Sequence, residues 1–346
     1  MSAPAPPDSR AESRARSKTA LKAAATLGIL AIVLYKVPFS ELAARLGKLR
    51  LFDVLALVAL TIAQVSFGVV RWFRLLRRLG ERPRFFALYG DVLVGLTYNM
   101  FLPTTVGGDV IRALRARKRV SAAHRAWSTS LFERIAGLLA MAASGAIAAT
   151  IGLGGGLGGG LGVGGENRVP PALQWIAGGA TLVLLLIFFF ASAPFRVLVR
   201  MLERRLPGAA DDVRGIVEDL EGPLATPGAR AEALAWSILV QALGIAFVVV
   251  GARGLDAPGH DAAILVGVPL VHVLSMVPIT IGGLGLREGL FVGILGMLRV
   301  PADVALGLAA QWLASSVAFA IAGAGVAVAD PAPSVHGDAR RGQARP

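Results

Sequence analysis

Apolar blocks separated by short basic segments make up most of the chain. The blocks are about 16–25 residues long, and a helix of about 20 residues spans the hydrocarbon core of a bilayer. The pattern therefore predicts an all-α fold, a polytopic integral membrane helical bundle. The expected crossings lie at 20–37, 52–73, 129–151, 173–192, 231–251, 262–281, 284–299 and 304–328.

The basic segments predict which ends face the cytoplasm, because cytoplasmic loops of membrane proteins carry an excess of Lys and Arg. The strongest such signal lies at 71–84, which holds six arginines. Segment 38–51 has leucines at helical spacing and predicts a short interfacial helix. Segment 196–230 is also basic and is expected to be cytoplasmic. We therefore expect both termini in the cytoplasm and the protein in the plasma (inner) membrane.

The block at 85–102 is apolar but has basic segments on both sides. A single crossing would place one of those segments outside, so we predict a re-entrant segment that enters and leaves from the cytoplasmic side. Irregular backbone at membrane depth is tolerated where it lines a wet cavity. Two topologies follow: eight crossings with one re-entrant segment, or six crossings with two, if 262–299 folds as a hairpin from the outside.

Two loops share the string P-x-T-[V/I]-G-G, one at 103–108 and the other at 278–283. Proline and paired glycines interrupt helices, and interrupted segments in two halves of a chain are typical of a transporter's binding site. Chance similarity in a chain with 42 glycines and 19 prolines is the competing explanation. The predicted loop residues are Pro103, Gly107, Gly108, Pro278, Gly282 and Gly283, and the predicted substrate-binding threonines are Thr104, Thr105 and Thr280.

The segment after the first loop carries arginines at helical spacing. Arg112, Arg115 and Arg119 fall on one face of a helix that Asp109 could cap. Guanidinium groups bind phosphate bidentately, and a helix N-terminus favours anions. The face is therefore a candidate phosphate site. The alternative is that these arginines only set the membrane topology and face anionic lipid headgroups.

Ionisable residues inside apolar blocks are functional candidates. Arg287 and Glu288 follow the second Gly-Gly, where apolar surroundings leave few structural reasons for a charge pair. Glu133 and Arg134 begin the block at 129–151 and could equally lie at the interface; Glu133 could pair with one of the arginines before it. Asn99, just before the first loop, is a further candidate.

Composition excludes several classes of protein. The chain is 55% hydrophobic and 16% charged, which does not suit a soluble globule. Its net charge of +13 is explained by the topology, so nucleic acid is not expected as a partner. The chain has no cysteine, no G-x-x-x-x-G-K-[ST] and no H-E-x-x-H. We therefore expect no cofactor and no metal.

Four strings together resemble the lysylphosphatidylglycerol synthase transmembrane-region family. They are R-W-x-R-L-L at 71–76, N-x-F-L-P-T-T-V-G-G-D-x-x-R at 99–112, S-x-x-x-x-E-R-x-x-G at 128–137 and P-I-T-I-G-G-L-G-L-R-E-G at 278–289. The resemblance covers roughly 20–330 and implies a flippase-like membrane domain that moves modified lipids between leaflets. The two-domain members of this family add a cytoplasmic synthase domain. The residues that follow 330 in this sequence are too few to form such a domain, so we expect none here.

These features predict three parts: a disordered basic cytoplasmic N-terminus at 1–19, a flippase-like transmembrane domain at 20–329, and a disordered tail at 330–346. The expected function is transport of a phospholipid or lipid-linked headgroup, with membrane lipid and a biosynthetic enzyme as partners. The phosphate would bind Arg112, Arg115 and Arg287. A membrane transferase that uses Asp109 and Glu133 is the rival, and a non-transporting scaffold is the third possibility.

Overall fold

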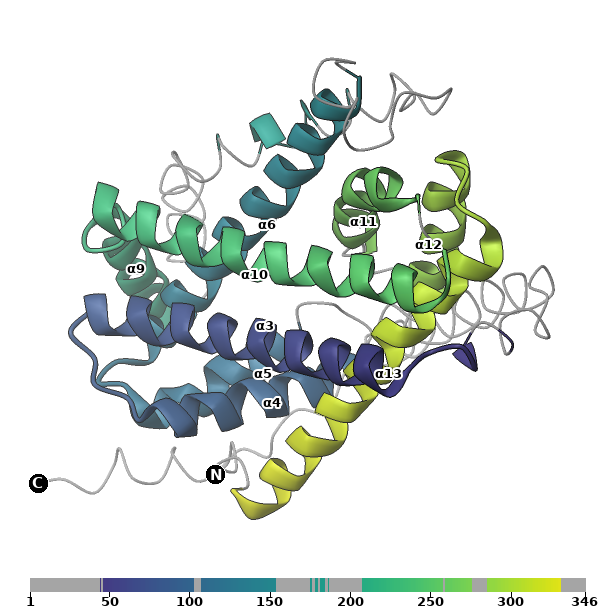
Figure 1. The fold of residues 1–346 in the computed structure, drawn as a ribbon. Helices are drawn as coiled ribbons and strands as arrows, with labels where there is room; N and C mark the ends of the chain where they lie inside the picture. Colours follow the sequence, from purple (N-terminus) through teal and green to yellow (C-terminus); the bar gives the residue numbers. More distant parts are fainter. Residues whose placement is uncertain are drawn as a thin grey trace, which may run out of the picture.

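The computed structural model describes 46–102, 107–153, 207–257, 259–275 and 285–330, with isolated positions at 44 and between 175 and 186. Every regular element within these residues is a helix (Figure 1). They are α3 (Leu51–Arg78), α4 (Phe85–Phe101), α5 (Gly107–Ala116), the 3-10 helix η1 (Arg117–Arg119), α6 (Ala123–Leu153), α9 (Pro207–Glu221), α10 (Pro227–Gly254), α11 (Asp261–Ser275), α12 (Leu286–Met297) and α13 (Ala302–Ala329).

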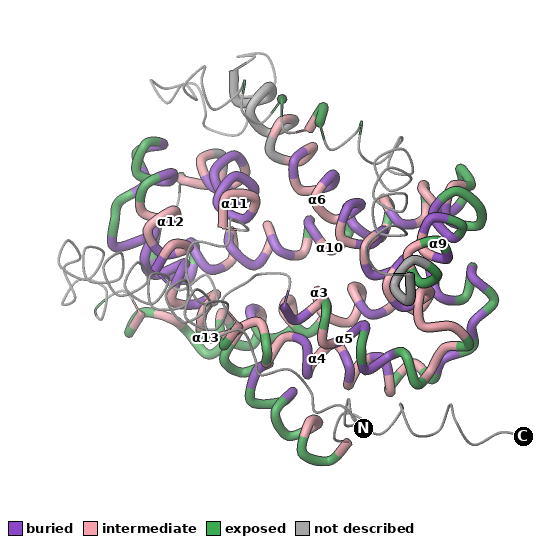
Figure 2. Tube along the Cα trace, turned by 180° about the vertical axis from the view of Figure 1, so that it is seen from behind, coloured by how far each residue is buried: buried purple, intermediate pink, exposed green. Residues whose placement is uncertain are grey.

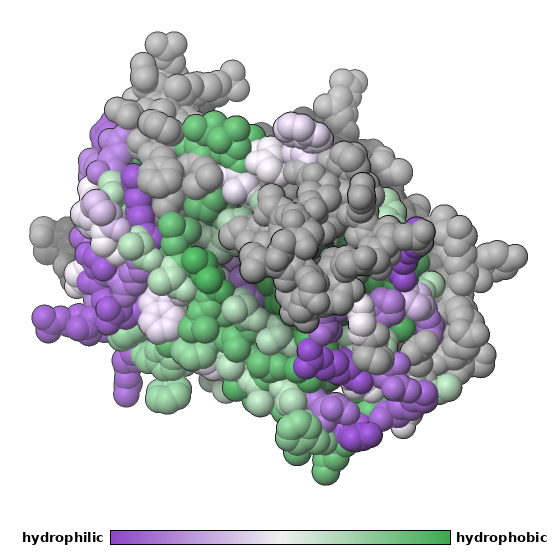
Figure 3. Space-filling model, turned by 45° about the horizontal axis from the view of Figure 1, so that its top comes forward, coloured by the Kyte–Doolittle hydropathy of each residue, from purple (hydrophilic) through white to green (hydrophobic). Residues whose placement is uncertain are grey.

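Three of the described helices, α3, α10 and α13, are long and apolar enough to cross a membrane, and each has 28 residues. Only 11% of the apolar stretch of α3, and the same share of α13, is buried. Large apolar side chains such as Phe52 and Leu55 of α3 and Ile321 and Val328 of α13 are exposed, as is expected of helices that face lipid. Figure 3 shows one face of the molecule, on which hydrophobic residues lie between two groups of hydrophilic residues. The all-α polytopic membrane fold predicted from the sequence is confirmed.

The helices α3 and α10 lie side by side and run in opposite directions (Figure 1). Arg71 contacts Ser237 at 2.7 Å, while Asp53, nearer the start of α3, lies beside Gly254 at the end of α10. The start of α10 follows from its sequence: Thr226 accepts a hydrogen bond from the Ala229 amide at 3.3 Å, and Pro227 needs no amide partner at that position.

Next to this pair, α4 and α5 form an antiparallel hairpin. Gly108 of α5 lies beside Gly95 of α4, and further along Arg115 pairs with Asp91 at 2.9 Å. A Cβ atom on Gly95 would lie 2.7 Å from the Gly108 carbonyl oxygen, so the close approach depends on glycine. The hairpin brings its two basic ends, before Phe85 and after Ala116, to the same side of the molecule.

A second hairpin is made by α11 and α12, where Gly267 lies against Leu295 and Leu298. The two helices have 15 and 12 residues, each fewer than the roughly 20 needed to cross the hydrocarbon core. Together with α10 and α13 they enclose the largest apolar core, in which Phe247, Phe291 and Leu308 are buried. The buried positions turn inward along these helices in the view from behind (Figure 2).

Several predictions fall outside the described residues. These are the first crossing at 20–37, the two terminal segments and most of 38–51 and of 173–192. The crossings predicted at 52–73, 231–251 and 304–328 coincide with α3, α10 and α13. Within the block 85–102, α4 runs without interruption from Phe85 to Phe101, and residues 103–106 of the first predicted loop lie outside the described residues.

The turn between α3 and α4 is tied to the turn before α6 by one carboxylate. Glu81 accepts hydrogen bonds from the Ser121 amide at 3.0 Å, the Ser121 hydroxyl at 2.5 Å and Arg125 at 2.7 Å. Burial alone would raise the pKa of Glu81, but these hydrogen bonds and the charge of Arg125 outweigh it and lower the pKa. Both turns lie outside the membrane-spanning helices.

We expect this carboxylate to make the fold sensitive to acid. Because its pKa is lower in the folded protein, its stabilisation is fully present above the ordinary glutamate pKa and is lost as the pH falls through the folded value. Glu81→Gln should lower the thermal unfolding temperature in detergent at pH 7 and flatten its fall below pH 5. An unchanged pH profile in Glu81→Gln would contradict this role.

Substitution of Gly95 should loosen the α4–α5 hairpin. Because its Cβ would meet backbone, Gly95→Ala is expected to cost about 1–3 kcal/mol of unfolding free energy, as for overpacked cores. Gly68, in α3, has nothing within 4 Å of the added carbon, so Gly68→Ala is the matched control and should be neutral or slightly stabilising. Thermal unfolding of both variants in detergent checks the difference.

Candidate functional site

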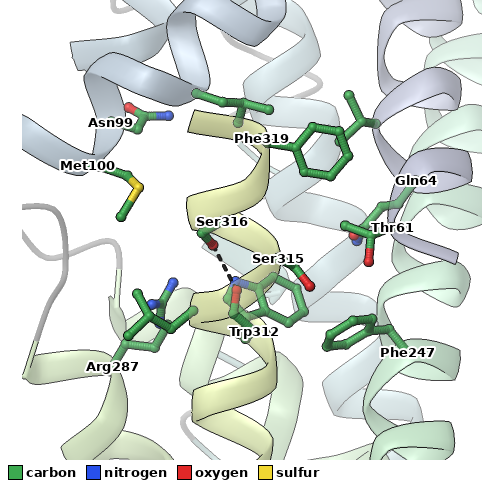
Figure 4. Close-up of a pocket in the computed structure, with 13 residues that line it drawn as sticks. Thr61, Gln64, Asn99, Met100, Phe247, Arg287, Trp312, Ser315, Ser316 and Phe319 are labelled. Atoms are coloured by element: carbon green, nitrogen blue, oxygen red, sulfur yellow. Dashed lines mark hydrogen bonds between the residues drawn. The ribbon is translucent and has the colours of Figure 1, made fainter. Parts of the chain in front are cut away.

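A cavity of about 260 Å³ opens between α3, α4, α10, α12 and α13 (Figure 4). Its wall is mixed: one charged side chain, amides and hydroxyls stand among aromatic and aliphatic groups. It is lined by Thr61, Gln64, Val65, Leu96, Asn99, Met100, Phe247, Arg287, Trp312, Leu313, Ser315, Ser316 and Phe319. Polar groups at this depth of an apolar bundle are costly unless they bind something.

Asn99 stands in this wall near the end of α4. Its side-chain oxygen accepts a hydrogen bond from the Gly108 amide at 2.7 Å, across the interruption between α4 and α5. The bond holds the start of α5 against α4 and fixes the Asn99 side chain. The amide nitrogen is left on the side of the cavity (Figure 4).

Arg287 enters the cavity from the first turn of α12. Its Nη2 atom lies 3.2 Å from the Glu288 carboxylate, while its buried Nε atom has no hydrogen-bond partner. The other oxygen of Glu288 is used by the Gly285 amide at 2.7 Å, which caps α12. The guanidinium is therefore partly buried, points into the cavity (Figure 4) and keeps N–H groups that its pair with Glu288 does not use.

The remaining polar wall offers mainly acceptors. The hydroxyls of Thr61, Ser315 and Ser316 donate to backbone carbonyls within their own helices, at 2.6, 3.0 and 2.9 Å. Gln64 donates its amide to the Val240 carbonyl at 3.3 Å. Each of these side chains keeps an oxygen that can accept a hydrogen bond from a ligand.

Aromatic rings form the rest of the wall. Trp312 packs edge-on against Phe247, with ring centroids 5.5 Å apart, and the buried His272 lies behind it at 4.4 Å. Packing on both sides holds the indole as a rigid surface of the cavity.

The charges predicted around the first loop lie outside this lining and pair with one another. Glu133, which is buried, lies 2.7 Å from Arg71 and 2.9 Å from Arg112. Arg112 also pairs with Asp109 at 3.1 Å, and Asp109 contacts Arg134. The Arg112 guanidinium is 4.9 Å from the ring of Trp72, whose indole donates to Thr129.

Arg115 and Arg119 are held by a second acidic group. Asp91, fully buried in α4, lies 2.9 Å from Arg115 and 2.6 Å from Arg119. Asp330, at the end of α13, contacts both arginines and Lys118. The hydrogen bond from Lys118, followed by that from Arg119, lowers the pKa of Asp330 despite slight burial.

The predicted phosphate site therefore separates into two parts. Arg112 turns toward α6 and Arg115 toward Asp91, each against a carboxylate, so the face on which they were expected to bind phosphate together is not free. Of the three arginines predicted to bind phosphate, Arg287 lines the cavity. Asn99, which precedes the first predicted loop, joins Arg287, which follows the second. One residue from the flank of each predicted loop thus lines the same cavity.

The loops themselves are only partly described. Pro103, Thr104, Thr105, Pro278, Thr280, Gly282 and Gly283 lie outside the described residues. Gly107 and Gly108, predicted as loop residues, begin α5 instead; Gly108 is required there because Asn99 and the Gly95 carbonyl approach it closely.

Sequence reasoning missed some residues of both parts. Arg71 was read as a topology signal, although it follows an apolar block directly, as an intramembrane partner of Glu133 would. Asp91 inside an apolar block was a visible signal for a buried pair. Gln64, Ser315 and Ser316 gave none, because small polar residues are common in membrane helices.

Comparison with known proteins gives one match. A family model described as "Lysylphosphatidylglycerol synthase TM region" matches residues 19–324. Neither the curated proteins nor the solved structures contain a match to the chain. The matched range includes both hairpins, the described cavity lining and both charge clusters except Asp330.

Removal of Glu133 should unfold the protein more readily than removal of an exposed partner. Glu133→Ala leaves Arg71 and Arg112 buried with less compensation, which typically costs about 3–5 kcal/mol. Lys48→Ala breaks an exposed pair with Asp256 and should cost at most about 1 kcal/mol. Thermal unfolding in detergent compares them, and equal losses would show that the buried cluster is not structural.

Proposed function

The chain belongs to the lysylphosphatidylglycerol synthase transmembrane-region family, a family of membrane proteins concerned with lipid, and on that premise we propose that it moves a lipid headgroup between leaflets. The headgroup occupies the cavity beside Asn99 and Arg287, while the acyl chains stay in the surrounding bilayer. The observation that carries this proposal is the guanidinium of Arg287, which is partly buried, faces a cavity large enough for a small polar group and has an Nε atom without a hydrogen-bond partner.

A charged headgroup crosses hydrocarbon slowly because it must leave water without compensation. The cavity supplies that compensation: Arg287 and the Asn99 amide donate to a phosphate, and the hydroxyl oxygens accept from the rest of the headgroup. The neighbouring wall of α13 is apolar on its outer side, where Ile321 is 69% exposed, and suits the acyl chains. The sequence carries no P-loop, so movement is downhill or coupled to an ion.

The two hairpins act as re-entrant elements in this proposal. The α4–α5 hairpin enters from the cytoplasm, since its two ends are basic and lie on one side, and the short α11–α12 hairpin enters from the outside. Asn99 of the first hairpin and Arg287 of the second both line the cavity, which then lies within the membrane. This arrangement corresponds to the topology of six crossings with two re-entrant segments, with both termini in the cytoplasm and the protein in the plasma membrane.

A transferase built on Asp109 and Glu133 is less well supported. A general acid or base must reach its substrate, whereas these carboxylates contact Arg112, Arg134 and Arg71 and do not line the cavity. A scaffold role would not explain why Arg287 lines a cavity with an Nε atom that has no hydrogen-bond partner.

Transport in liposomes tests the proposal. Purified protein should accelerate the movement of acyl-labelled phosphatidylglycerol between leaflets, measured by reduction of the label from outside. Arg287→Ala should slow this movement about tenfold or more, because a hydrogen bond to a charged group contributes about 1.5–3 kcal/mol. Asn99→Ala should slow it less.

The matched control is Arg253→Ala. Arg253 pairs with Asp261 on the exposed surface, at 2.7 Å, and its loss should leave the rate unchanged. If the folded Arg287→Ala variant moves lipid as fast as the wild type, the cavity is not the path.

A further inference from the structure

We propose that the cavity selects a monoanionic phosphodiester headgroup that carries hydroxyl groups, a glycerol or sugar phosphate, and rejects the cationic aminoacyl headgroup for which the family is named. The inference rests on the proposed function and deepens it by naming the class of cargo. It is drawn from the charge, hydrogen-bonding direction and shape of the wall.

The charged group that faces the cavity is a cation, because the carboxylate that pairs with Arg287 lies outside the lining. Arg287 is the one charged residue among the described lining residues, and no carboxylate lines the cavity there. Glu288 is used by the Gly285 amide and by Arg287, while Glu133 and Asp109 are held in ion pairs of their own. A phosphate can accept the hydrogen bonds that Arg287 has left to donate, whereas an added ammonium group would lie beside a like charge with no carboxylate in the described lining to pair with.

The hydrogen-bonding direction of the wall calls for donors on the ligand. Thr61, Ser315 and Ser316 have directed their protons to helix carbonyls, and Gln64 has directed an amide proton to Val240. Four oxygen acceptors therefore remain. Hydroxyl groups of a glycerol or sugar satisfy them without adding charge, while a headgroup that lacks donors leaves them unsatisfied.

The shape of the wall suits a small, compact group. A cavity of about 260 Å³ lies below the range of roughly 300–1,000 Å³ that is usual for drug-sized ligands. The Trp312 indole gives a flat apolar surface for the carbon face of a polyol, held rigid by Phe247 and His272. A long aminoacyl extension fits neither the volume nor the charge.

Liposome transport of four acyl-labelled lipids separates these features. The probes are phosphatidylglycerol, phosphatidylmethanol (the same charge without hydroxyls), phosphatidylethanolamine and lysylphosphatidylglycerol. Phosphatidylglycerol should move about tenfold faster than phosphatidylmethanol and faster still than lysylphosphatidylglycerol. Equal rates for phosphatidylglycerol and lysylphosphatidylglycerol would overturn the charge selection, and equal rates for phosphatidylglycerol and phosphatidylmethanol would overturn the hydroxyl recognition.

Two variants test the assigned groups. Arg287→Glu should reverse the charge preference and favour lysylphosphatidylglycerol, while Arg287→Gln, which removes charge at similar size, should abolish the preference. Ser315→Ala together with Ser316→Ala should slow phosphatidylglycerol toward the rate of phosphatidylmethanol and leave phosphatidylmethanol itself unaffected. A preference that persists in Arg287→Gln would place the selectivity elsewhere.

A binding measurement separates failure of this inference from failure of transport. In detergent, phosphatidylglycerol should raise the unfolding temperature of the wild type more than lysylphosphatidylglycerol does, and this difference should vanish in Arg287→Gln. Selective stabilisation without any lipid movement would refute the transport function and keep the cargo class. Glycerol 1-phosphate is the soluble counterpart, and equal stabilisation by it at equal concentration would overturn a lipid cargo.

Discussion

The buried carboxylate of Glu133 pairs with two arginines, and this shared pairing fixes five of the described helices relative to one another. Arg71 of α3 contacts one of its oxygens at 2.7 Å and Arg112 of α5 contacts the other at 2.9 Å. Buried ions are costly unless their charge and hydrogen-bonding groups are matched, so these helices cannot slide without separating the charges. Arg71 also donates to Ser237 of α10, and α5 carries α4 through the hairpin. Five helices, α3, α4, α5, α6 and α10, thus take their places around one residue.

The same chemistry gives opposite results in the two parts of the molecule. Arg112 and Arg115 are buried and Arg287 is partly buried, and each would serve equally well as a phosphate ligand in isolation. The first two meet carboxylates from other helices, which leaves them a structural role. Among the described residues, the carboxylate that Arg287 pairs with is that of its neighbour Glu288, whose second oxygen accepts from the Gly285 amide at the start of α12. The capacity of each arginine to bind a ligand therefore depends on how many of its N–H groups are not already used by carboxylates of the protein.

The sequence predicted the helical membrane class and the long helices because a run of about 20 apolar residues has few other stable states. The shared Pro-Thr-Gly-Gly string also drew attention to Asn99, before the first loop, and to Arg287, after the second, and both line the cavity. The sequence did not distinguish the arginine that lines the cavity from those that are held in ion pairs with carboxylates. Arg112 and Arg115 stand three residues apart on one helix, yet their partners, Glu133 and Asp91, come from different helices, and such pairing is a tertiary property that spacing does not encode. The acceptors at Ser315 and Ser316 were hidden for the same reason.

The long helix α13 lines the cavity at one end and is held at the other. Trp312 stands in the wall, while Asp330, eighteen residues later, contacts Arg115, Lys118 and Arg119 at the basic end of the α4–α5 hairpin. At about 1.5 Å per residue, the distance between these points is about 27 Å. A tilt of about 5° about the held end shifts the indole by about 2 Å, which is comparable with the radius of a headgroup atom. Because α13 joins the two points, a change in the ion pairs of Asp330 would move Trp312 and so change the width of the cavity.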